Sequence, residues 1–186
     1  SSFSSNLFNG VRVDCGGKAL LRDCRCNECC GSGLGVSDTD SSATAHSCSL
    51  SSNKYDGAIA RDGAYVQLHS CQCSYSKSMC GLSVLDGGSA VATGCCLSYN
   101  DHNNVECCGS GHIELRDCEC NGARALAGMA VSGLGSFAKA SGCSFSGNEH
   151  CGVNMEHGGG VSCAIAIVFE AREQVASGCL VRAVQL

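Results

Sequence analysis

Short stretches of alternating apolar and polar residues recur along this chain at a nearly constant spacing. Each of the clearest copies runs into a reference position that holds cysteine, with apolar residues three and five positions before it and a polar residue two positions before it. Such alternation is typical of a strand with one buried face. The reference cysteines follow one another every 23 to 25 residues, a period typical of a solenoid, and they are Cys24, Cys48, Cys71, Cys95, Cys118 and Cys143.

The apolar positions predict two short strands in each repeat, separated by glycine-rich turns. The strand that runs into the reference position has as its inward pairs Ala19 and Leu21, Ala43 and Ala45, Val66 and Leu68, Ala90 and Ala92, Ile113 and Leu115, Ala138 and Ala140, and Val161 and Cys163. The other strand begins about 13 residues earlier, and its expected leading residues are Val11, Val36, Ile59, Leu82, Val105, Met129 and Val153.

Asparagine marks the bend that follows the reference position. Five residues beyond that position stand Asn6, Asn53, Asn100 and Asn148. Asparagine tolerates left-handed backbone and can form hydrogen bonds along a pile of equivalent turns. The same corner is therefore expected to recur from repeat to repeat.

Two strands and tight turns within 23 to 25 residues resemble the right-handed parallel β-helix, the pectin-lyase-like family of β-helix repeats. The resemblance implies an all-β solenoid of about seven rungs over residues 1–168. Residues 169–186 leave the pattern, and we expect them to form a cap or the start of a further coil. The resemblance predicts the fold more closely than the function.

Composition removes some function classes and leaves the state of the cysteines open. The net charge of −5 and the lack of a basic stripe argue against a nucleic-acid partner, and no apolar run is long enough to span a membrane. The 19 cysteines are read as reduced core residues, because they share positions with Leu, Phe, Val and Ala. This interpretation favours a reducing intracellular compartment; a partly disulfide-bonded extracellular chain and metal-bound cysteines are the alternatives.

Neither a metal nor another cofactor is predicted. Cys24, Cys26, Cys29 and Cys30 form a dense thiol group of the kind that binds zinc. Two of these positions, however, alternate into the expected core. Their counterparts in the next repeat are Cys48 and Leu50, so a thiol is not required at both of them.

Two groups of outward residues are candidates for function. The first is a surface ladder of Arg22, His46, His69 and Arg116, in which the two histidines are expected to be neighbours on successive rungs. They would be close enough to share an ion or to titrate together, although solvated surface histidines are the simpler interpretation.

The second group is an acidic corner with a single nearby base. Its residues are Asp38, Asp40, Asp62, Asp86 and Arg61. In enzymes of the family that this chain resembles, carboxylates on adjacent coils bind calcium or act as acid and base on a polysaccharide. Asp-Gly pairs are also ordinary turn residues. The absence of proline excludes the Asp-Pro-His-Glu motif of the alginate epimerases.

These observations favour a non-catalytic β-helix that serves as a scaffold or protein-interaction module, and no catalytic residues are assigned. The first residues fall within a repeat, so we expect the chain to be part of a larger protein or assembly with protein partners. The alternative is a carbohydrate-binding or polysaccharide-cleaving domain that uses the acidic corner. The balance of these arguments leans against an enzyme.

Overall fold

The computed structural model describes residues 1–164, and every helix or strand in that part is a β-strand. No helix in the described part is long and apolar enough to cross a membrane. The strands are β1 (Val11–Val13), β2 (Lys18–Arg22), β3 (Leu34–Ser37), β4 (Ser42–His46), β5 (Ala58–Arg61), β6 (Tyr65–His69), β7 (Leu82–Val84), β8 (Ser89–Thr93), β9 (Val105–Cys108), β10 (His112–Arg116), β11 (Met129–Ser132), β12 (Phe137–Ser141), β13 (Val153–Glu156) and β14 (Gly160–Ala164).

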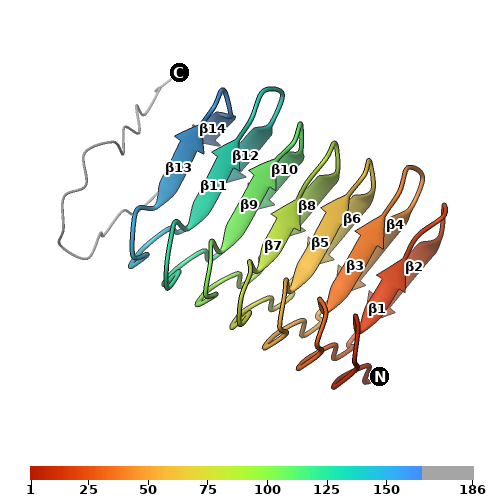
Figure 1. The fold of residues 1–186 in the computed structure, drawn as a ribbon. Helices are drawn as coiled ribbons and strands as arrows, with labels where there is room; N and C mark the ends of the chain where they lie inside the picture. Colours follow the sequence, from red (N-terminus) through yellow and green to blue (C-terminus); the bar gives the residue numbers. More distant parts are fainter. Residues whose placement is uncertain (165–186) are drawn as a thin grey trace.

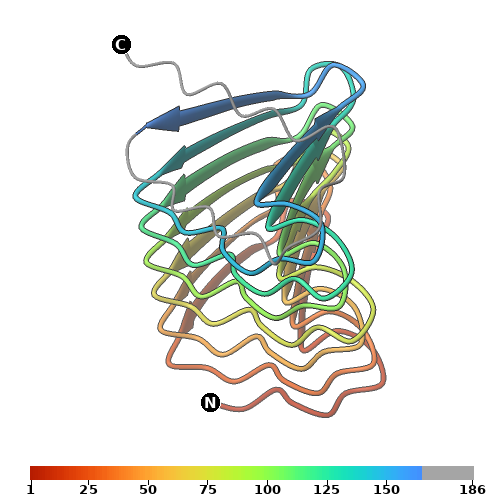
Figure 2. The ribbon, with the colours of Figure 1, turned by 90° about the vertical axis from the view of Figure 1, so that its left-hand side faces the viewer.

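Each rung contributes one strand to each of two parallel sheets. The odd-numbered strands form one 7-stranded sheet and the even-numbered strands form the other, so the stack grows by one rung at a time from the N-terminus (Figure 1). Seen from the side, the two sheets are separate walls joined by turns (Figure 2). A third column consists of single parallel bridges that run from Ser2 to Ser144. The predicted all-β parallel solenoid of about seven rungs is confirmed.

The even-numbered sheet follows the predicted alternation closely. Leu115 of β10 lies in register with Ala92 of β8 and Ala140 of β12, and all three side chains are buried. The other inward pairs are buried or partly buried, except that the side chain of Cys163 lies outside the described set. Burial of one apolar column against the next supplies the main stabilising contribution to the coil.

The odd-numbered sheet corrects two of the expected leading residues. Val11 pairs with Leu34, and Leu34 pairs with Ala58, so Val36 and Ile59 are not the equivalents of Val11. Val36 is buried two residues after Leu34, in register with Val13. Ile59 lies on the outer face, in register with Gly35. Five residues separate Val36 from Ser42, whereas four separate their partners in register, Val13 and Lys18. Counting back from the cysteine therefore displaced the frame at β3.

The reference cysteines form a buried column whose thiols are also hydrogen-bonded. Each sulfur donates to the carbonyl oxygen two residues earlier, as in Cys24 to Arg22 (3.2 Å) and Cys118 to Arg116 (3.2 Å). The thiol thus gives this carbonyl oxygen a hydrogen-bond donor, and no larger side chain is needed. The column thus combines the packing of a small apolar residue with a weak donor.

Buried asparagines bind the backbone of neighbouring rungs, and Asn104 also links Asn100 and Asn148 through side-chain hydrogen bonds. Asn53 Oδ1 accepts the Cys29 N–H (2.9 Å), and its Nδ2 donates to the Cys26 carbonyl (3.0 Å). Asn100 repeats the first contact with Ser76, at 2.9 Å. Because Asn stands in every second rung and Cys29 or Ser76 stands between, the corner repeats over two rungs. The predicted domain limit at residue 168 and the predicted cap over residues 169–186 lie outside the described residues.

Substitution of neighbouring inward and outward residues tests this assignment. Leu115→Asp places a charge in a fully buried apolar column, so we expect it to lower the free energy of unfolding by more than about 4 kcal/mol. Arg116→Asp introduces the same side chain on the exposed face and should cost about 1 kcal/mol or less. Urea unfolding followed by circular dichroism measures both. Similar losses in the two variants would show that the inward and outward faces are assigned wrongly.

Candidate functional site

The surface ladder predicted from the sequence is a column of the even-numbered sheet. His46 lies between Arg22 and His69 in register, and the two histidine rings stack with centroids 4.8 Å apart and planes inclined by 9°. Thr93 separates His69 from Arg116, and Arg116 instead pairs with Glu114 at 2.9 Å. The structure therefore brings the histidines together but does not bring the four residues to one point.

The acidic corner lies in the turns that follow the odd-numbered strands. Asp38, Asp40, Asp62 and Asp86 all have positive φ, between 48° and 74°, and Asp38 accepts the N–H of Cys15 at 3.2 Å. Arg61 pairs with Asp62 at 3.5 Å. Within residues 1–164, these carboxylates do not form a group of three whose ligand atoms lie within 4.8 Å. Their turn geometry accounts for Asp at these positions, and a binding role for them stays a prediction.

Two separate hollows of about 260 Å³ each lie on the outer face of the odd-numbered sheet, beside the loops that precede its strands. The first hollow lies over the early rungs and is lined by Asn9, Arg12, Ser32, Gly35, Val36, Ser37, Tyr55, Asp56, Ile59, Arg61 and Met79. The second lies over the late rungs and is lined by His102, Asn103, Glu106, Leu126, Ala127, Ala130, Val131, Ser132, His150, Cys151, Asn154 and Glu156.

A polar column lies in the loops that precede the odd-numbered strands. Two residues before each odd-numbered strand, Asn9, Asp56 and Asn103 accept the N–H of the next rung through Oδ1, at 3.0, 3.3 and 3.0 Å. The N–H groups belong to the residues that hold this position in the intervening rungs, which include Ser32 and Cys80. Asp56 thus replaces an asparagine of the repeat and keeps the same backbone contact.

Asp56 is a buried carboxyl, with only 3% of its surface exposed. Its Oδ1 also accepts the Ser83 hydroxyl at 2.5 Å. Burial raises the pKa of Asp56 to about 6, and the negative charge of Glu106 acts in the same direction, against the hydrogen bonds from Ser83 and Cys80. The carboxyl therefore takes up a proton well above the ordinary pH range of an aspartate.

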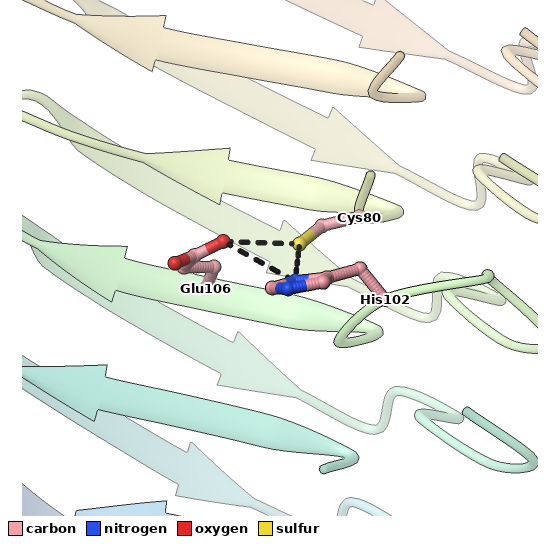
Figure 3. Close-up of side chains that lie close together, drawn as sticks. All are labelled: Cys80, His102 and Glu106. Carbon is pink, nitrogen blue, oxygen red and sulfur yellow. Dashed lines mark hydrogen bonds and ion pairs between the residues drawn. The ribbon is translucent and has the colours of Figure 1, made fainter. Parts of the chain in front are cut away.

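Cys80, His102 and Glu106 point toward one another (Figure 3), and His102 and Glu106 also line the second hollow. Cys80 Sγ lies 3.2 Å from Glu106 Oε2 and 3.8 Å from His102 Nδ1, and His102 Nδ1 lies 3.8 Å from Glu106 Oε2. In the described part of the chain, this is the one group of at least three Cys, His or carboxylate side chains close enough to share an ion.

The same surroundings argue against Cys80 as a nucleophile. Burial raises the pKa of the Cys80 thiol well above its ordinary value, and the charges of Glu106 and Asp56 raise it further. Nucleophilic cysteines need the opposite environment, because the thiolate is the reactive form. A thiol without a cation beside it therefore stays protonated here.

Sequence reasoning did not identify this group. Cys80 and His102 stand in loops of different rungs and Glu106 stands in a strand, with separations of 22 and 26 residues from Cys80. The signal that leads to them is the register of the repeat. Once the rungs are aligned through Leu82 and Val105, Cys80 falls over the loop of His102 and the strand of Glu106.

Comparison with known proteins places this geometry in a fold family. The family model described as a right handed beta helix region matches residues 9–166. No curated protein matches the sequence. A similar solved structure is the A-module of the mannuronan C-5 epimerase AlgE4 from Azotobacter vinelandii, with 10% identity and a TM-score of 0.55 over 94% of this chain. The match spans 56% of that module's chain, and at this identity it shows the fold alone.

Asp56→Asn tests the environment of the buried carboxyl, because asparagine holds the equivalent position in other rungs. The folded-state pKa is above the ordinary 3.8, so the contribution of Asp56 to stability is fully present below pH 3.8 and is lost as pH rises through about 6. Relative to the native protein, Asp56→Asn should therefore gain about 2–3 kcal/mol in free energy of unfolding between pH 4 and pH 7.

Urea unfolding at several pH values, with a metal chelator present, measures this gain. Asp86→Asn corrects for the loss of one carboxylate from the surface. A stability difference between Asp56→Asn and the native protein that does not change with pH would contradict the buried environment of Asp56.

Proposed function

Because the chain belongs to the right-handed β-helix family, we propose that it is a binding module that receives an extended carbohydrate chain along the odd-numbered sheet. The observation that carries the proposal is the presence of two hollows of about 260 Å³ each on the outer face of that sheet. Parallel rungs repeat at about 4.8 Å, so the same kinds of side chain are offered at regular steps. A polymer of similar units is the ligand class that suits such a surface.

The lining of the first hollow has the chemistry that binds sugars. Tyr55 is 44% exposed and presents an aromatic ring against which a sugar ring can pack. Asn9 and Arg61 line the same hollow and supply planar hydrogen-bonding groups. The guanidinium of Arg61 pairs with Asp62 at 3.5 Å and remains about half exposed, so it can also contact a carboxylated sugar.

The similar solved structure supports the ligand class only indirectly. Its name describes an epimerase that acts on mannuronan, which is a polysaccharide, while the likeness itself concerns the fold. Catalysis is not part of the proposal.

Two tyrosines with the same exposure provide the test. Tyr55 lines the first hollow, whereas Tyr75 lines neither hollow, and each is 44% exposed. Binding is measured by affinity electrophoresis and calorimetry against neutral and acidic polysaccharides. We expect Tyr55→Ala to weaken binding about tenfold, the typical effect of removing one well-packed aromatic contact, and Tyr75→Ala to leave it unchanged. Absence of binding to the whole panel, or equal loss in both variants, would refute the proposal.

A second candidate function, a protein-interaction scaffold, is favoured by a different corner of the coil. The rings of Tyr75 and Tyr99 stack with centroids 5.6 Å apart, and Tyr99 is 48% exposed. Both residues have a φ of 62°, an uncommon conformation for a bulky side chain. Exposed aromatic pairs of this kind are enriched in protein interfaces.

The scaffold hypothesis predicts that the Tyr75 and Tyr99 replacements, and not Tyr55→Ala, impair binding to a partner protein. Replacement of Tyr75 and Tyr99 together by Ala should abolish a stable protein complex detected by native mass spectrometry, whereas Tyr55→Ala should leave it intact. A complex that survives the double replacement would exclude this corner as the contact surface.

A further inference from the structure

The ligand atoms of Cys80, His102 and Glu106 form a triangle with sides of 3.2, 3.8 and 3.8 Å. A zinc ion bound tetrahedrally by sulfur at about 2.3 Å and by nitrogen and oxygen at about 2.0–2.1 Å holds its ligands about 3.3–3.6 Å from one another. Shifts of a few tenths of an ångström would adapt the observed triangle to one ion. We propose that these three residues form a zinc site with three protein ligands.

The ligand types select the metal. A thiolate with an imidazole and a carboxylate suits a borderline-soft ion such as Zn²⁺, whereas calcium and magnesium take oxygen ligands. Zinc binding releases the Cys80 thiol proton to solvent and replaces it with a metal-sulfur bond. The proposal concerns zinc and is separate from the carbohydrate proposal.

The scaffold holds the ligands from two adjacent rungs. Cys80 precedes β7, and His102 and Glu106 lie just before and within β9. These two strands are paired through Leu82 and Val105. Figure 3 shows the three side chains pointing toward one another from these elements. Ligands fixed by a paired sheet keep their separation without an ion, which reduces the ordering that binding requires.

The proposed site is open to solvent on one side. Cys80 is fully buried, while the side chains of His102 and Glu106 are 38% and 25% exposed. Because His102 and Glu106 line the second hollow, an ion would reach the site from there. Three protein ligands with one accessible position are the arrangement found where zinc carries water or substrate.

The surrounding groups favour a cation. Among the described residues, Glu106 has no Lys or Arg partner within ion-pair distance, and its ion-pair partner is His102. Asp56 adds a second carboxyl that binds the Cys80 N–H and the Ser83 hydroxyl and so anchors the backbone of the Cys80 ligand. Asn103 Nδ2 lies 3.3 Å from His102 Nδ1. A bound ion would replace this amide as the partner of the Nδ1 lone pair.

The test must separate a built site from scavenging by a chain with 19 cysteines. The full chain is prepared under reducing conditions, loaded with Zn²⁺, dialysed, and measured for metal content and for zinc affinity by competition with a chromogenic chelator. We expect one tightly bound zinc per chain. Cys80→Ser and Glu106→Gln should each weaken affinity at least about 100-fold, since loss of an outer-shell partner alone typically costs about 10–100-fold.

Matched variants make the result specific. Cys108→Ser removes a half-buried cysteine on the same strand as Glu106 and should leave stoichiometry and affinity unchanged. Ser83→Ala should weaken zinc binding by about tenfold through Asp56. With Co²⁺ in place of zinc, the thiolate-to-cobalt charge-transfer band should be present in Cys108→Ser and absent in Cys80→Ser. Circular dichroism establishes that each variant is folded.

Three outcomes would overturn the site. These are a native protein that retains no zinc after dialysis, a Cys80→Ser variant that binds zinc as tightly as the native protein, and equal losses in Cys80→Ser and Cys108→Ser. If Cys80→Ser does not fold, Glu106→Gln decides the matter, because its side chain is partly exposed and its loss does not open the core.

Discussion

Parallel hydrogen bonding between successive rungs is the constraint on which the structure depends. Each strand of one rung is paired in register with its counterparts above and below, so each side chain meets the residue at the same position of the neighbouring rung. Apolar columns then become a continuous core, and polar columns must be satisfied within the stack. The buried asparagines and the reference cysteines meet this requirement by bonding to backbone groups of their own or the adjacent rung.

The same constraint explains how much of the fold could be predicted. Inward pairs such as Ala92 and Leu115 are visible in the sequence because a strand with one wet face alternates strictly. The leading residues of the other sheet were less visible, because turn length varies by one residue between rungs. At β5 the small Ala58 faces inward and the larger Ile59 faces outward, so hydrophobicity alone favoured the wrong residue.

The two hollows and the Cys80 group could not be obtained from local patterns. The acidic corner was prominent because Asp precedes Gly at two of its turns, yet turn geometry accounts for those residues. Cys80, His102 and Glu106 belong to no short motif, and they converge only when the rungs are placed in register. A solenoid site is assembled across the repeat, so the information lies in columns rather than in contiguous sequence.

At the candidate site, the residues in several columns differ from the residues at the same positions of other rungs. Asp56 stands where Asn9 and Asn103 stand in other rungs, and Glu106 stands in a column that holds Ser83 and Ala130 on either side. A single exchange of this kind would bury a carboxylate and reduce stability. Cys80, His102 and Glu106 bring a thiol, an imidazole and a carboxylate to one point from neighbouring rungs. Packing does not require these side chains, because other rungs of the coil form without them. The proposed zinc site accounts for their convergence beside the second hollow.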